Sequence, residues 1–165
     1  MAAVSGEPGG SQVEASVPVP LTLYLVKRLE LVIRALLDDI LRPVGLTTGH
    51  YTAMSVLDGR GAMSSAQLAR RSFLRPQTMH EVMQTLERRG LIIREPKPGN
   101  KRVLLATLTE HGRELLDECA PRVREVEGVL LDGLTPGQQA IFREGLQHGI
   151  SALAELSQGT ASRMI

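Results

Sequence analysis

The sequence has one cysteine, no long apolar run and no basic residue near its beginning. The single cysteine, Cys119, excludes an internal disulfide framework and a cysteine-rich zinc module, so packing must stabilise the fold, and a reducing compartment is expected. The longest stretch without Lys, Arg, Asp or Glu, residues 43–57, falls short of the roughly 18 apolar residues of a membrane helix. No lysine or arginine precedes Lys27, so the cationic start of an export leader is missing. We therefore expect a cytoplasmic protein without a membrane span.

Motifs of enzymes and cofactor-binding proteins are also missing. There is no nucleophile elbow, no phosphate-cradling glycine loop and no paired-carboxylate motif. The four histidines are scattered, and no set of His, Asp and Glu repeats at the helix-face spacing that a metal ion needs. Cys119 follows Asp117 and Glu118, whose charges disfavour a thiolate, so we interpret it as a quiet helical cysteine rather than a redox sensor. We expect neither catalysis nor a metal or other cofactor.

What the sequence does contain is a basic block in its centre. The chain of 165 residues suits a single domain with a substantial core, and its net charge is only +1. From Arg60 to Arg102, however, ten basic residues stand against three acidic ones, whereas the rest has nine basic and fifteen acidic residues. Because the local field steers a polyanion, this block is typical of a nucleic-acid-binding surface on a separate scaffold. The alternative is that these charges are only the solvated faces of helices.

The two ends of the chain differ in character. Residues 1–20 hold three glycines, three prolines and no aromatic residue, too little apolar surface to offset the entropy of ordering, which predicts a flexible tail. Apolar residues then repeat at spacings of three and four over residues 21–41, which predicts a long helix. That helix is apolar over most of its circumference, which indicates a subunit interface. Near the other end, Thr109 caps a helix that Pro121 should kink or interrupt, and Thr135 caps a closing helix that frays after Ser157.

The middle of the chain predicts three short helices and a hairpin. A helix opens at Thr47 or Thr48, which leaves Gly49 either in its interior, at a cost of about 1 kcal/mol, or at its start. Ser64 and Gln67 form a capping box for the next helix. The buried side of that helix is expected to consist of Leu68, Ala69 and Phe73. The next helix is predicted from Pro76 to Arg89, with the apolar stripe Met79, Val82, Met83 and Leu86. Two strands, Leu91–Glu95 and Arg102–Leu108, are predicted around the turn Lys97-Pro98-Gly99-Asn100.

This order of elements is that of a helix-turn-helix followed by a wing. The second helix of such a motif is slim enough to enter the major groove and read base edges. The candidates for base contacts are Arg75, Gln77, Thr78, His80 and Glu81. The candidates for contacts of the hairpin with phosphates or the minor groove are Lys97, Lys101 and Arg102. Four further arginines are either phosphate contacts or solvated charges: Arg70, Arg71, Arg88 and Arg89.

Residues 64–115 resemble the winged-helix core of the MarR family of bacterial transcriptional regulators, and residues 46–57 resemble that family's second helix. The wing has Asn100 where the family usually has an aspartate two residues before an arginine, here Arg102. The resemblance implies a homodimer with intertwined terminal helices, two winged-helix lobes on a pseudo-palindrome, and repression relieved by a small ligand, often an aromatic acid. It also implies that ligand contacts lie on the first two helices, and the candidates there are Tyr24, Arg28, His50 and Tyr51, with Arg28 able to neutralise a carboxylate. Residues of these types are more often ordinary core or surface residues, and that alternative stays open for each of the four.

The sequence therefore predicts a mainly α winged helix-turn-helix with a two-stranded β wing and N- and C-terminal dimerisation helices. Its parts are a flexible tail (1–20), a helical dimerisation region (21–46 and 109–157) and a DNA-binding lobe (47–108). The expected function is repression of transcription by a homodimer that binds double-stranded DNA sequence-specifically and is modulated by a small molecule. The alternatives are an interaction module that has lost DNA affinity and a ligand-sensing protein without a DNA target. The basic block and the hairpin tip favour DNA over both.

Overall fold

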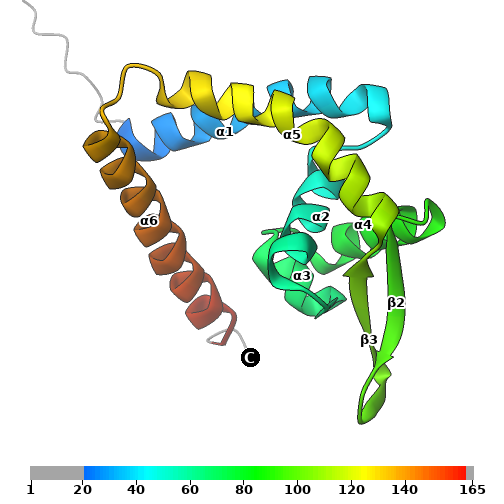
Figure 1. Cartoon of the computed structure of the whole chain (residues 1–165). Coiled ribbons are helices and arrows are strands. Elements are labelled where there is room, and N and C mark those ends of the chain that lie inside the picture. Colours follow the sequence, from blue (N-terminus) through cyan, green and yellow to red (C-terminus); the bar gives the residue numbers. More distant parts are fainter. Residues whose placement is uncertain (1–20, 163–165) are drawn as a thin grey trace, which may run out of the picture.

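The computed structural model describes residues 21–162, and the tail predicted for residues 1–20 lies outside this range. The described chain is mainly helical with one small sheet (Figure 1). Its helices are α1 (Leu21–Leu41), the short 3-10 helix η1 (Arg42–Val44), α2 (Thr48–Arg60), α3 (Ser65–Arg71), α4 (Pro76–Arg88), α5 (Glu110–Leu131) and α6 (Pro136–Ser162). Its strands are β1 (Met63–Ser64), β2 (Ile92–Lys97) and β3 (Asn100–Leu108). None of the helices within residues 21–162 has the length and apolar character needed to cross a membrane.

The core lies where α2, α3, α4 and the sheet meet. The stripe predicted for α4 is buried there, with Met79, Met83 and Leu86 at 1% exposure or less. The capping box at the start of α3 is confirmed, because Ser64 Oγ accepts from the Gln67 N–H (3.3 Å) while Gln67 Oε1 accepts from the Ser64 N–H (3.0 Å). Since the apolar side of α4 is used in this core, its polar side faces outward.

The sheet has three antiparallel strands in the order β1-β3-β2, one more than the predicted two-stranded wing. The wing hairpin of β2 and β3 is confirmed, and both strands extend further toward the tip than expected. The additional strand β1 pairs Met63 with Ala106 and Ser64 with Leu105. Two residues are too few to produce an alternating pattern, so β1 had no signal in the sequence.

The prediction that Phe73 lies on the buried side of α3 is wrong. Helix α3 ends at Arg71, and Phe73 has a left-handed backbone (φ 53°) and a side chain that is 69% exposed. The Leu74 N–H bonds back to the Ala69 carbonyl (3.0 Å), and Leu74 packs against the core. This sharp reversal turns Phe73 outward and brings Leu74 inward.

Helices α1 and α5 lie side by side, and α6 runs away from them (Figure 1). Pro121 does not interrupt α5, which stays one helix from Glu110 to Leu131 and changes direction along its length (Figure 1). Helix α6 continues to Ser162, beyond the fraying predicted after Ser157. The consequence is a long helical frame beside a compact lobe that carries the wing.

Candidate nucleic-acid interface

The start of α4 presents a free polar face. Arg75 is the N-cap residue, with an extended backbone and no side-chain capping bond, and Pro76 at the first helical position has no N–H to leave unpaired. The predicted base-contacting residues are all exposed: Arg75, Gln77, Thr78, His80 and Glu81. Their own contacts are weak or local, with Gln77 Nε2 3.4 Å from Glu81 Oε1 and His80 Nε2 3.0 Å from Gln84 Nε2. The structure thus brings these five side chains together on one surface helix.

The wing projects from the lobe (Figure 1), and its tip carries basic residues. Lys97, Lys101 and Arg102 are all exposed around the turn between β2 and β3. Asn100 Oδ1 accepts a hydrogen bond from the backbone N–H of Arg102 at 3.2 Å. Asn100 therefore orders the turn through the backbone and leaves the Arg102 guanidinium free of that contact.

The four arginines for which the sequence allows two roles, phosphate contact or solvated charge, differ in their environments. Arg70, Arg71 and Arg88 are exposed, and Arg88 donates to the Thr85 hydroxyl one helical turn away, at 3.3 Å. Arg89 is half-buried and donates to the backbone carbonyls of Gly45 (2.6 Å) and Val44 (2.8 Å). Arg89 therefore fits neither alternative, because its guanidinium is engaged within the protein.

A second arginine ties α4 to the wing. Arg94 on β2 forms an ion pair with Glu87 on α4, and its Nε donates to Glu87 Oε2 at 2.8 Å. This hydrogen bond from Arg94 lowers the pKa of the Glu87 carboxyl. The pair holds the end of α4 against the base of the wing.

The start of α2 contains a capping box closed by a histidine. Thr47 Oγ1 accepts from the His50 N–H (3.3 Å), and His50 Nδ1 accepts from the Thr47 N–H (3.0 Å). Gly49 lies in this first turn, so of its two predicted positions the helix start is correct. Burial, and then the charge of Arg89, lower the pKa of His50, which keeps the ring neutral and able to accept.

Acid should weaken this cap. A histidine whose folded-state pKa lies below its ordinary value of 6.5 contributes stability that is present above that value and lost as the pH falls. We expect His50→Gln to keep the capping box without the titration, because glutamine is a common residue at this capping position. Thermal unfolding at pH 7.5 and 5.5 should then show a larger drop for the parent than for the variant. Equal drops would contradict the assignment.

The acidic residue Asp38 on α1 forms a contact that sequence reasoning did not find. Its Oδ1 accepts from the Thr48 N–H (3.1 Å) and the Thr48 hydroxyl (2.6 Å) at the start of α2, and these bonds lower the pKa of Asp38. The two residues are ten positions apart and the chain turns between them, so no local spacing could have revealed the bond.

The four predicted effector residues form two separate pairs. Near the start of α1, the Arg28 guanidinium lies over the exposed ring of Tyr24, 5.5 Å from its centroid. His50 and Tyr51 are half-buried at the start of α2, and Tyr51 lines a hollow of about 490 Å³ together with Leu37. At 1.5 Å per residue, Tyr24 lies about 20 Å along α1 from Leu37. A single chain therefore does not bring the two pairs together.

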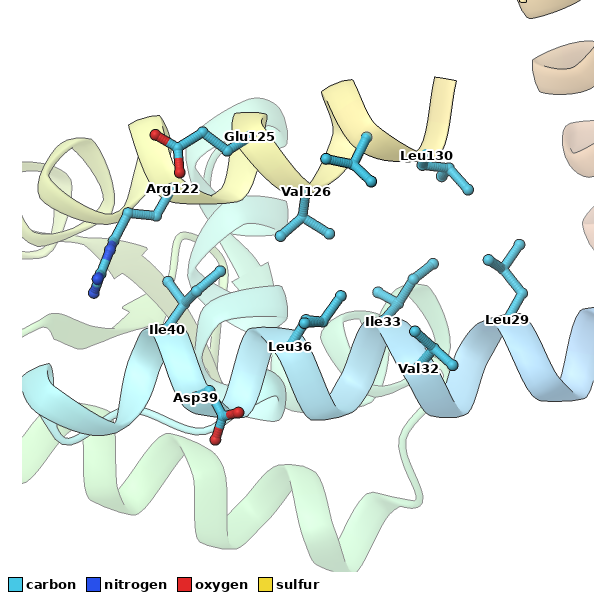
Figure 2. A pocket seen from close by; sticks show the side chains of 11 residues that line it. Leu29, Val32, Ile33, Leu36, Asp39, Ile40, Arg122, Glu125, Val126 and Leu130 are labelled. Atoms are coloured by element: carbon cyan, nitrogen blue, oxygen red, sulfur yellow. The ribbon is translucent and has the colours of Figure 1, made fainter. Parts of the chain in front are cut away.

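An apolar groove lies between α1 and α5 on the helical frame. It has a volume of about 520 Å³, and Figure 2 shows Ile33 and Leu36 of α1 facing Val126 of α5. Many apolar side chains of α1 outside this groove are exposed as well, including Leu23 (60%) and Leu31 (52%). Within residues 21–162, no group of three or more His, Cys, Asp or Glu side chains could hold a metal ion.

Known proteins share both the sequence pattern and this fold. The sequence model of the MarR family matches residues 44–103. The HTH-type transcriptional repressor Rv2887 of Mycobacterium tuberculosis is 35% identical over 124 residues, which are 75% of this chain and 89% of that protein. The crystal structure of the M. tuberculosis MarR family protein Rv2887 with salicylic acid has 32% identity and a TM-score of 0.62, and covers 82% of this chain and 98% of that one. A MarR-family regulator from Rhodococcus sp. RHA1 shares the fold, with a TM-score of 0.73 at 23% identity over 82% of this chain and 96% of its own.

Proposed function

Because the chain belongs to the MarR family of transcriptional regulators, we propose that it is a repressor that binds a pseudo-palindromic operator as a homodimer and responds to a small ligand. Its relatives are regulators of transcription and not enzymes. The observation that carries the proposal is the exposed polar face of α4 beside a wing with a cationic tip.

The roles on DNA follow from side-chain chemistry. In the major groove, Arg75 can bind guanine with two hydrogen bonds and Gln77 can do the same with adenine. Thr78, His80 and Glu81 complete the polar face and offer a hydroxyl, a ring nitrogen and a carboxylate to base edges. Lys97, Lys101 and Arg102 at the tip of the wing would contact phosphates or the minor groove. The lobe 47–108 of one chain would thereby contact one half-site of the operator.

The homodimer is supported by apolar surface that one chain leaves uncovered. Contiguous exposed apolar patches mark interaction sites in soluble proteins. Exposed apolar residues follow α1 and recur on α6, where Ile141, Ile150 and Leu153 are between 49% and 70% exposed. The groove between α1 and α5 adds a concave apolar surface to the same frame (Figure 2). We assign residues 21–46 and 109–157 to dimerisation, which leaves the lobe free for DNA.

The hollow beside Tyr51 is our candidate for the effector site. Its volume of about 490 Å³ lies in the usual range for small-molecule sites, and Arg60 at its edge could pair with a carboxylate. The solved relative Rv2887 was crystallised with salicylic acid, a small aromatic acid of this kind. His50 is the chain neighbour of Tyr51, whereas Tyr24 and Arg28 form a separate candidate pair near the start of α1.

The test is fluorescence anisotropy of the full-length protein with the DNA upstream of its own gene and with a scrambled duplex, over a salt series. We expect tight binding to the native duplex, well above the scrambled one, and a steep fall with salt. Equal weak binding to both duplexes, together with a selection from a random library that yields no preferred duplex, would contradict the proposal. A fold that no longer reads DNA would then be the better description.

Two substitutions should separate base reading from phosphate binding. Gln77→Ala should relax the preference for the operator over other duplexes by about 1–3 kcal/mol at the base pair it reads. Lys101→Ala should weaken all duplexes alike and lower the slope of log affinity against log salt by about one. Both are measured in the same anisotropy series. Parent-like binding of every duplex by both variants would overturn the groove assignment.

A further inference from the structure

Two neighbouring arginines at the end of α4 have different environments. Arg88 is exposed, and its guanidinium donates to the Thr85 hydroxyl one helical turn away. Arg89 is half-buried and reaches 44 and 45 positions back along the chain to two backbone carbonyls. The same side chain at adjacent positions therefore provides an internal comparison.

The carbonyls that Arg89 contacts belong to the connection between α1 and α2. They are those of Val44, the last residue of η1, and Gly45, which has a left-handed backbone (φ 66°) and donates its N–H to the Arg42 carbonyl. A Cβ added at Gly45 would lie 3.5 Å from Arg89 Nη1, so the guanidinium packs directly over this glycine. The planar fork of arginine suits two acceptors at once, and hydrogen bonds from a charged donor are stronger than neutral ones.

Helix α4 is thus held at its end from two sides. Glu87 pairs with Arg94 on β2, which ties α4 to the wing within the lobe. Arg89 ties α4 to the segment that leaves α1, the long helix of the frame. Of these two contacts, only that of Arg89 joins the DNA-facing helix to the chain outside the lobe 47–108.

We propose that Arg89 is a positioning residue that fixes α4 relative to α1, and so sets the separation of the two α4 helices in the dimer. The consequence for DNA rests on the proposed function. Dimers of helix-turn-helix proteins bind half-sites about one helical turn apart, so the angle between lobe and frame selects the spacing. Since the apolar stripe of α4 is buried in the lobe core, losing Arg89 leaves the helix folded but its orientation to α1 less restricted.

The test compares Arg89→Met with Arg88→Met, using the duplex that the parent protein selects from a random library and the same duplex with one base pair inserted between its half-sites. We expect Arg89→Met to bind the selected duplex about tenfold more weakly with an unchanged salt slope. We also expect the inserted base pair to weaken its binding less than it weakens the parent's. The inserted base pair should weaken DNA binding by Arg88→Met as much as it weakens DNA binding by the parent.

The contact of Arg89 with Val44 and Gly45 can also be tested without DNA. Hydrogen exchange at the amides of Gly45 and Leu46 should be faster in Arg89→Met than in the parent and unchanged in Arg88→Met. Arg89→Lys keeps the charge but not the fork, so its exchange rates should lie between those of the parent and Arg89→Met. This conservative variant keeps the test usable if the methionine variant does not fold.

Two results would overturn the inference. One is parent-like exchange at Gly45 and Leu46 in both Arg89 variants. The other is a slope of log affinity against log salt that falls by about one in Arg89→Met, while the inserted base pair weakens binding as much as it does in the parent. That result would make Arg89 a phosphate contact. If the parent shows no sequence preference, the proposed function fails, and the exchange rates alone decide whether Arg89 holds α4 to α1.

Discussion

Replacing Gly112 by alanine is expected to destabilise the protein by about 3 kcal/mol, the upper end of the range for overpacking, although alanine is the better helix former. A Cβ at this position in the first turn of α5 would lie 2.4 Å from the Leu91 carbonyl oxygen and 2.7 Å from Leu108 Cδ1. The Leu91 carbonyl accepts from the Thr109 N–H (3.0 Å), and the Thr109 hydroxyl accepts from the Gly112 N–H (3.1 Å). The clash can be relieved only by moving backbone that these bonds hold in place.

Gly128→Ala is the matched control, because it lies in the same helix and a Cβ there meets nothing within 4 Å. Helix propensity then acts alone and should stabilise α5 by up to about 1 kcal/mol. Urea unfolding measures both variants at one fixed protein concentration, since the stability of the proposed dimer would depend on concentration. The two substitutions should change the free energy of unfolding in opposite directions. A Gly112→Ala variant as stable as the parent would contradict the close packing of α5 on the sheet.

Features encoded within a few residues could be predicted from the sequence. The capping box of Ser64 and Gln67 and the buried stripe of α4 depend on spacings of three and four, which are visible in the chain itself. The candidate base contacts lie together for the same reason, since residues on one helix face are neighbours by geometry. These elements define the fold and the position of α4, the helix that we propose enters the major groove.

Features that depend on distant parts of the chain could not be predicted. Strand β1 is two residues long and exists only because β3 passes beside it. Arg89 and Asp38 find partners 45 and 10 positions away, and their sequence contexts resemble those of solvated surface charges. The sequence places Phe73 on the buried side of α3 because an apolar residue directly after a helix is typical of its buried face, whereas a left-handed backbone at Phe73 reverses the chain there.

The position of the predicted effector residues illustrates the same limit. Tyr24 and Arg28 lie one turn apart on α1 and do meet, but the distance between them and Tyr51 is set by how α1 packs on α2. The hollow at Tyr51 is formed by Leu37 and by residues of α2 as far as Arg60, which share no motif in the sequence. Cavities of this kind arise from packing and have to be found in the structure.

The second large effect is expected from Leu36→Lys in the groove between α1 and α5. Leu36 faces α5 across the groove and is 44% exposed in one chain, so the lobe core does not depend on it (Figure 2). In the proposed dimer a second copy covers this surface, and an unpaired ammonium placed there would be costly to bury. The variant should therefore sediment as a single chain of 17.9 kDa with near-parent helicity.

Loss of the dimer should also remove operator binding. One lobe reaches only one half-site, and linking two binding modules raises affinity by about 10²–10⁴ over either alone, so Leu36→Lys should bind the selected duplex at least about 100-fold more weakly. Glu30→Lys is the control, because it adds more positive charge to the same helix on the side where Glu30 pairs with Lys27 and Arg34. Exposed pairs contribute little, so Glu30→Lys should remain a dimer with parent-like or tighter DNA binding. A dimeric Leu36→Lys variant with parent affinity would place the interface on another part of the frame, whereas a monomer that still binds tightly would show that a single lobe suffices.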